Sequence, residues 1–279
     1  MSQARPGPVR PAPAPEPLPA ETFDSHCHLD MIDRPVPQVL AEARAAGITR
    51  VVTVGCDLPS SRWAASCAAE HRDVYAAVAI HPNETARAAG SAAQREEVLA
   101  QIGALAALPQ VRAVGETGLD YYRDSAAPAV QREWFRAHIE IAKQSAKALM
   151  IHDRDAHEDV LRILDAEGAP EQVIFHCFSG DAAMAKRCAE AGYVLSFAGT
   201  VTFANARQLR DAAAAVPADL ILVETDSPFL TPVPNRGKPN APAQVAHTLR
   251  AIAGLQRMSA GELCAQIAST GERVFGQWA

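Results

Sequence analysis

Short apolar runs rich in Val and Ile alternate along this chain with Ala- and Leu-rich stretches whose apolar positions recur at helical spacing. The alternation begins near residue 22. It predicts strands near residues 22–27, 50–55, 74–80, 111–116, 148–152, 172–176, 193–197 and 220–225. It predicts helices near residues 35–46, 59–71, 91–107, 127–146, 155–167, 181–191, 204–215 and 241–255. Eight such pairs favour a closed parallel (β/α)8 barrel, a TIM barrel of the α/β class.

An open Rossmann-type sheet is the alternative fold. No GxGxxG motif follows the first predicted strand, so the pattern disfavours it. A last helical stretch, Ser259 to Phe275, is expected to pack outside the barrel.

Length and composition fit one domain. The 279 residues suit a single barrel of about 250 residues. Residues 1–20 are dominated by Pro and Ala and predict a disordered or polyproline-like tail, which leaves residues 21–279 for the barrel. The tail lacks the apolar core of a secretory signal, and no apolar run approaches the roughly 18 residues of a membrane span.

Six cysteines without a CxxC pair favour reduced thiols, and we expect a cytoplasmic protein with no membrane association and no obligate protein partner. The net charge of −6 argues against a broad basic surface that binds duplex DNA. A polyanionic substrate would have to be held locally, by metal ions and a few arginines.

Residues that bind metals end five of the predicted strands. His26 and His28 lie two apart on the first strand, so both side chains point to one face. The other candidates end strands far apart in sequence, and only a closed barrel brings strand ends together. They are Glu116, His152, His176 and Asp226. Four imidazoles and two carboxylates suffice for two divalent ions with a bridging carboxylate and open positions for water.

The alternative is that these histidines are satisfied by hydrogen bonds in the core. For one HxH pair alone this interpretation would usually hold. Burying all six groups without metal would leave two negative charges among four imidazoles, which is costly unless each charge is paired. The six together therefore predict a metal centre at the carboxyl ends of the strands, where barrel enzymes place their active sites.

Seven segments resemble, in order and spacing, the motifs of the TatD family of metal-dependent deoxyribonucleases in the amidohydrolase superfamily. They are DSHCHLD, AIHPNE, GETGLDYYRD, IHDRDA, HCFSG, ETDSPFL and PNRGKPNAP, and the resemblance covers about residues 22 to 276.

The resemblance implies a role for each candidate ligand. His26 and His28 match the histidines that hold one metal, and Glu116 matches the carboxylate that bridges both. His152 and His176 match the histidines of the second metal. Asp226 matches an aspartate beside the metals, a ligand and proton acceptor for the attacking water. Glu116 and Asp226 are thus the expected catalytic residues.

Five further residues are expected to bind substrate. His81 ends the third predicted strand, and it would orient substrate or donate to a phosphate; a strand-capping histidine is the alternative. Four basic residues would form a phosphate clamp, unless each is a solvated loop charge. They are Arg123, Arg154, Arg236 and Lys238.

The function expected is that of a deoxyribonuclease, an exonuclease that cleaves phosphodiester bonds of single-stranded or end-accessible DNA with a metal-activated water. The cofactors are two divalent ions. Imidazole-rich sites suit Zn²⁺ or Mn²⁺ while the resemblance implies Mg²⁺, so the element stays open. One alternative is C–N or ester hydrolysis on a small molecule. The other is a non-catalytic binding protein with structural metal.

Overall fold

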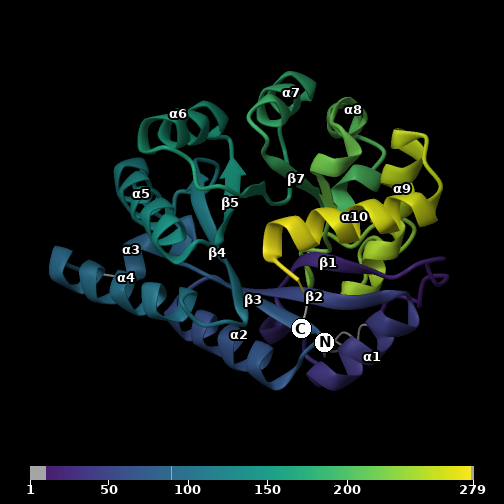
Figure 1. Ribbon diagram of the computed structural model, residues 1–279, viewed down its shortest axis with the longest axis horizontal. Coiled ribbons are helices and arrows are strands. Elements are labelled where there is room, and N and C mark those ends of the chain that lie inside the picture. Colours follow the sequence, from purple (N-terminus) through teal and green to yellow (C-terminus); the bar gives the residue numbers. More distant parts are fainter. Residues whose placement is uncertain (1–10, 89, 278–279) are drawn as a thin grey trace, which may run out of the picture.

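Eight parallel strands form one sheet that curls into a barrel, as the computed structural model shows for residues 11–88 and 90–277 (Figure 1). Each strand pairs with the next in sequence, from β1 to β8. The strands are β1 (Thr22–Cys27), β2 (Ile48–Gly55), β3 (Val74–Val78), β4 (Val111–Asp120), β5 (Ala148–Arg154), β6 (Val173–Phe175), β7 (Val194–Phe197) and β8 (Ile221–Val223). The predicted single-domain (β/α)8 barrel is confirmed.

Helices follow the strands and surround the barrel (Figure 1). They are α1 (Val36–Ala45), α2 (Leu58–Glu70), α3 (Thr85–Ala88), α4 (Ala92–Ala106), α5 (Pro128–Ser145), α6 (His157–Glu167), α7 (Ala182–Glu190), α8 (Arg207–Ala215), α9 (Val245–Gln256) and α10 (Ala260–Phe275). All nine expected helices are present, and α3 is an additional short one. The last helix lies outside the barrel as predicted, with Phe275 edge-on to Phe23 of β1.

Local sequence explains where several helices begin. Asp57 and Ser259 each form a capping box, in which the side chain accepts a backbone N–H of the first turn. Pro128 occupies the first turn of α5, where its missing N–H costs nothing. In the described part of the chain, no helix combines the length and apolarity needed to cross a membrane.

Two strands run further than predicted. The prediction ended them at Glu116 and His152, but β4 continues to Asp120 and β5 to Arg154. The ladder between them continues too, since Gly118 pairs with His152. Residues 117–120 are buried, so their backbone groups need the partners that this ladder supplies.

Residues 11–20 contain no helix or strand, but they are packed against the barrel. Leu18 is buried, and its N–H donates to Ala46 O at 3.0 Å. Gln244 and Arg250 donate to backbone carbonyls of the segment. The described part of the predicted tail, residues 11–20, thus contacts the barrel, while residues 1–10 lie outside the described residues.

The barrel closes between β1 and the residues that follow β8. Cys27 and Ser227 form a parallel bridge. Asp226 N donates to His26 O at 2.9 Å, and His28 N donates to Ser227 O at 2.8 Å. The closure therefore holds His26, His28 and Asp226 beside one another.

Candidate metal centre

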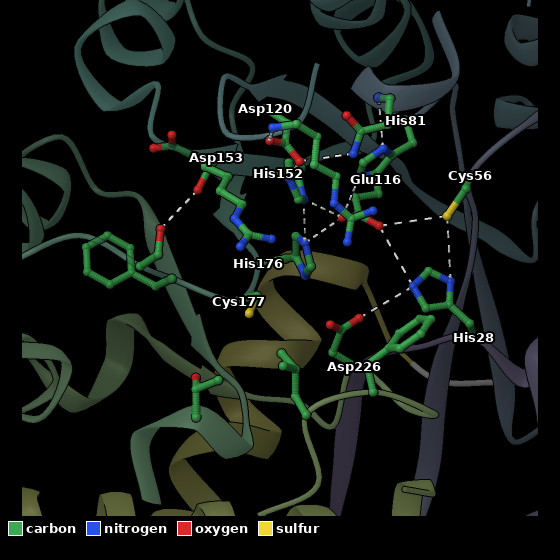
Figure 2. A pocket seen from close by; sticks show the side chains of 18 of the residues that line it. His28, Cys56, His81, Glu116, Asp120, His152, Asp153, His176, Cys177 and Asp226 are labelled. Atoms are coloured by element: carbon green, nitrogen blue, oxygen red, sulfur yellow. Dashed lines mark hydrogen bonds and ion pairs between the residues drawn. The ribbon is translucent and has the colours of Figure 1, made fainter. Parts of the chain in front are cut away.

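The six predicted ligands meet at one end of the barrel, and five of them line a cavity of about 730 Å³ (Figure 2). The sixth, His26, is fully buried beside His28. Five of the six ligands lie close to the carboxyl ends of β1, β5, β6 and β8, whereas Glu116 lies within β4 (Val111–Asp120). Parallel strands present these ends on the same face, which is why residues distant in sequence converge here.

The two oxygens of Glu116 face two different groups of ligand atoms. Oε2 lies 3.6 Å from His26 Nε2 and 3.8 Å from His28 Nε2. Oε1 lies 2.7 Å from both His152 Nδ1 and His176 Nε2. Glu116 thus lies between two candidate metal positions, a first and a second, as a bridging carboxylate would.

The first position has the spacing of a coordination shell. His26 Nε2 and His28 Nε2 lie 3.3 Å apart, and Asp226 Oδ1 lies 3.7 and 3.5 Å from them. Four ligands at 2.0–2.2 Å from one ion at tetrahedral angles lie about 3.4 Å apart. A divalent ion therefore fits among His26, His28 and Asp226 without rearrangement of the backbone, with Glu116 Oε2 beside the two imidazoles.

The second position offers fewer protein ligands. His152 Nδ1 and His176 Nε2 lie 3.4 Å apart, with Glu116 Oε1 between them. Three protein ligands leave coordination sites for water or substrate, the arrangement of catalytic rather than structural sites.

A second group of atoms fixes which nitrogen each histidine presents. His28 Nδ1 donates to Val54 O at 2.9 Å, and His176 Nδ1 donates to Glu224 Oε1 at 3.1 Å. His152 is reversed: its Nε2 donates to Asp120 Oδ2 at 3.3 Å, which leaves Nδ1 for the metal. Such outer partners orient metal-bound imidazoles.

Asp120 and Glu224 were not predicted from the sequence. Both are fully buried. Strand periodicity could have indicated them, because Asp120 lies four residues beyond Glu116 and Glu224 two before Asp226.

Burial and charge act in opposite directions on the ligands. Burial alone would raise the pKa of Glu116, but the imidazoles of His176 and His81 outweigh it and hold that pKa well below its usual value. Burial lowers the pKa of His26 well below its usual value. An ionised carboxylate and a neutral imidazole are the forms that bind metal, and Glu116 and His26 are held in these forms. In contrast, burial would lower the pKa of His176, but Glu116 and Glu224 outweigh it and raise that pKa well above its usual value, so a metal that binds there would displace a proton.

His81 lies beside the second position, in the residues that follow β3. Its Nε2 lies 3.2 Å from Glu116 Oε1. Its Nδ1 accepts a hydrogen bond from Asn83 N at 3.0 Å, so the hydrogen of the neutral ring is on Nε2. His81 therefore donates to Glu116 and lines the cavity, where its proposed contact with substrate stays a prediction.

The four predicted basic residues fall into two pairs. Arg123 and Arg154 line the cavity, and the guanidinium of Arg154 stacks on the Tyr122 ring at 3.9 Å. Arg236 and Lys238 are exposed and do not line it, although both are described. Arg236 instead stacks on Phe203 at 4.2 Å. The structure thus brings two members of the predicted clamp to the site and leaves two outside the cavity.

A (β/α)8 barrel with this set of ligands at its strand ends belongs to the class of metal-dependent hydrolases. The comparisons with known proteins narrow the class. Residues 23–276 match the family model described as TatD related DNase, and the chain belongs to the TatD family.

Relatives cover nearly the whole chain. An uncharacterized metal-dependent hydrolase TatD of Mycobacterium tuberculosis is 47% identical over 262 residues, 91% of this chain and 97% of the relative. An uncharacterized metal-dependent hydrolase of Bacillus subtilis is 40% identical over 91% of this chain and 98% of its own. The crystal structure of a TatD homologue from Escherichia coli K12 superposes with a TM-score of 0.85 at 25% identity, covering 92% of this chain and 98% of the homologue. The predicted family is confirmed.

Proposed function

We propose that this protein is a deoxyribonuclease that hydrolyses phosphodiester bonds at accessible ends of DNA. The observation that supports the proposal most is that the two carboxylate oxygens of Glu116 face two adjacent metal positions. Divalent ions bound there would activate water and neutralise charge on the attacking and leaving oxygens of a phosphoryl group.

The side chains of the cavity have matching roles in this proposal. Asp226 reaches the first position from beside the ions and accepts a proton from the attacking water. Arg123 and Arg154 pair with phosphate oxygens, for which planar guanidinium groups are suited. A cavity of about 730 Å³ is in the range of small-molecule sites, so it takes a nucleotide at a strand end.

A small-molecule hydrolase is the second candidate function, with cleavage of a C–N or ester bond at the same centre. The apolar side of the cavity favours it, because Met31, Phe178 and Phe229 line the space together with the arginines. An apolar wall of this kind suits a neutral substrate.

The test is hydrolysis of end-labelled single-stranded and duplex DNA by metal-stripped protein that is resupplied separately with Mg²⁺, Mn²⁺ or Zn²⁺. We expect metal-dependent release of nucleotides from one end, and loss of this release in Glu116→Ala. Failure of folded, metal-loaded protein to release nucleotides, together with turnover of neutral esters or amides, would transfer the assignment to the small-molecule hydrolase.

A further inference from the structure

Cys56 places a thiol at the edge of the first metal position. It follows β2 directly and lines the cavity, and Figure 2 shows its sulfur directed between Glu116 and His28. Its backbone is fixed on both sides, because Cys56 N donates to Ser60 Oγ at 3.0 Å and Cys56 O accepts from His81 N at 2.8 Å. The thiol is therefore held in place before any ion binds.

The distances bring this thiol within reach of an ion at the first position. Cys56 Sγ lies 3.9 Å from Glu116 Oε2 and 3.8 Å from the ring of His28 at Nδ1. Ligand atoms of His28, Cys56 and Glu116 all lie within 4.8 Å of one another. With a metal–sulfur bond of about 2.3 Å and a metal–oxygen bond of about 2.1 Å, sulfur and oxygen on one ion lie at most about 4.4 Å apart. One ion can therefore bind Glu116 and Cys56 together.

We propose that Cys56 is a further ligand of the first metal position. It coordinates thiophilic divalent ions, whereas Mg²⁺ and Mn²⁺ are bound by the other ligands alone. Thiolates prefer soft and borderline ions such as Zn²⁺ and Cd²⁺, whereas hard ions prefer oxygen. When a thiophilic ion binds, the Cys56 S–H bond breaks, the sulfur–metal bond forms, and the proton passes to solvent. The identity of the ion at this position thus depends on one residue beyond the six ligands.

The test is a titration of the metal-free, full-length protein with Cd²⁺, followed by the ultraviolet charge-transfer absorption of a cadmium–thiolate bond. We compare the wild type with Cys56→Ser and with the matched control Cys177→Ser, a cysteine that lines the same cavity. No substrate is present, so the result is independent of the proposed deoxyribonuclease activity. Cys56→Ala replaces the serine variant if that variant does not fold.

We expect a saturable absorption band in the wild type and in Cys177→Ser that is absent from Cys56→Ser. The Cd²⁺ affinity of Cys56→Ser should fall by about tenfold or more, while its Mn²⁺ affinity stays that of the wild type. A band that persists in Cys56→Ser, or a wild type that binds Cd²⁺ without any band, would overturn the proposal. Equal loss of Mn²⁺ and Cd²⁺ affinity would also overturn it, because the thiol would then be structural.

Discussion

Asp226 is close to the first metal position and is held there by its backbone, as a proton acceptor must be. Its Oδ1 lies within 3.7 Å of both His26 and His28, and its backbone forms part of the closure between β1 and β8. A carboxylate beside the ions can accept the proton of the attacking water, so Asp226→Asn should lower the turnover of DNA by a factor of about 10² to 10⁴. The measurement is hydrolysis at saturating metal, with metal content and the melting curve as controls. Turnover equal to the wild type in a metal-loaded variant would contradict the role.

Asp120 would act on a bound metal ion through His152, whose ring it orients. It accepts from His152 Nε2 and also from Asn83 Nδ2 at 3.0 Å, and these hydrogen bonds outweigh its burial and lower its pKa. Asp120→Asn should reduce metal affinity by about 10- to 100-fold, since the imidazole loses its oriented acceptor. Isothermal titration with Mn²⁺ measures this. Asp124→Asn, an exposed carboxylate of the same segment, is the control and should bind Mn²⁺ like the wild type.

At the scale of elements, β4 and β5 approach each other so closely at Gly118 that no side chain fits between them. Gly118 has φ of +134°, and a Cβ at this position would lie 2.1 Å from His152 O. Gly118→Ala should destabilise the protein by roughly 3 kcal/mol or more and displace the strand that carries His152. Gly168→Ala has a positive φ but no atom within 4 Å of its Cβ, so it should cost only about 1–2 kcal/mol. Urea unfolding of both variants checks the difference, and equal losses would contradict the close approach.

The contact of α5 with the barrel makes stability depend on pH. His138 Nε2 accepts from Ile80 N at 3.2 Å, and burial lowers the pKa of His138 to about 3. In the unfolded chain its pKa is about 6.5, so the unfolded state binds the proton first as pH falls. The free energy of unfolding therefore decreases below about pH 6.5. Between about pH 7 and pH 5, it should fall by about 2 kcal/mol more in the wild type than in His138→Gln.

Urea unfolding in the presence of chelator measures this difference, because chelation removes the separate pH dependence of metal binding. Parallel pH curves for the wild type and His138→Gln would show that His138 is protonated to the same extent in both states.

The elements differ in how far the sequence predicts them. Strands such as β2 are buried runs of Val and Thr between helical segments, so local pattern is sufficient to locate them. The length of β4 depends instead on its pairing with β5, and the position of Asp120 depends on that pairing. Likewise the sequence assigns both Arg236 and Arg154 to the phosphate clamp, yet only Arg154 lines the cavity. Contacts between segments, which a single sequence does not state, decide these cases.

At the scale of the whole molecule, residues 11–20 join the start of the chain to its last third. Gln244 is buried, donates to Pro13 O at 2.9 Å, and accepts from Asn235 Nδ2 at 2.9 Å. Asn235 belongs to the segment that follows β8 and Asp226. The N-terminal segment therefore supports a loop next to the metal centre, although it contributes no ligand.

Removal of residues 1–20 should therefore destabilise the barrel. Burial of a Leu side chain such as Leu18 stabilises by about 1.5–3 kcal/mol, and an unpaired buried amide such as Gln244 costs about 1–3 kcal/mol. For a chain of this size, the two together lower the melting temperature by roughly 5–15 °C. The reference is a chain that begins at Pro11, which retains both contacts, and Leu18→Ala in the full chain should reproduce part of the loss. If the chain that lacks residues 1–20 has the same melting temperature as the reference, the contacts of Leu18 and Gln244 contribute nothing to stability.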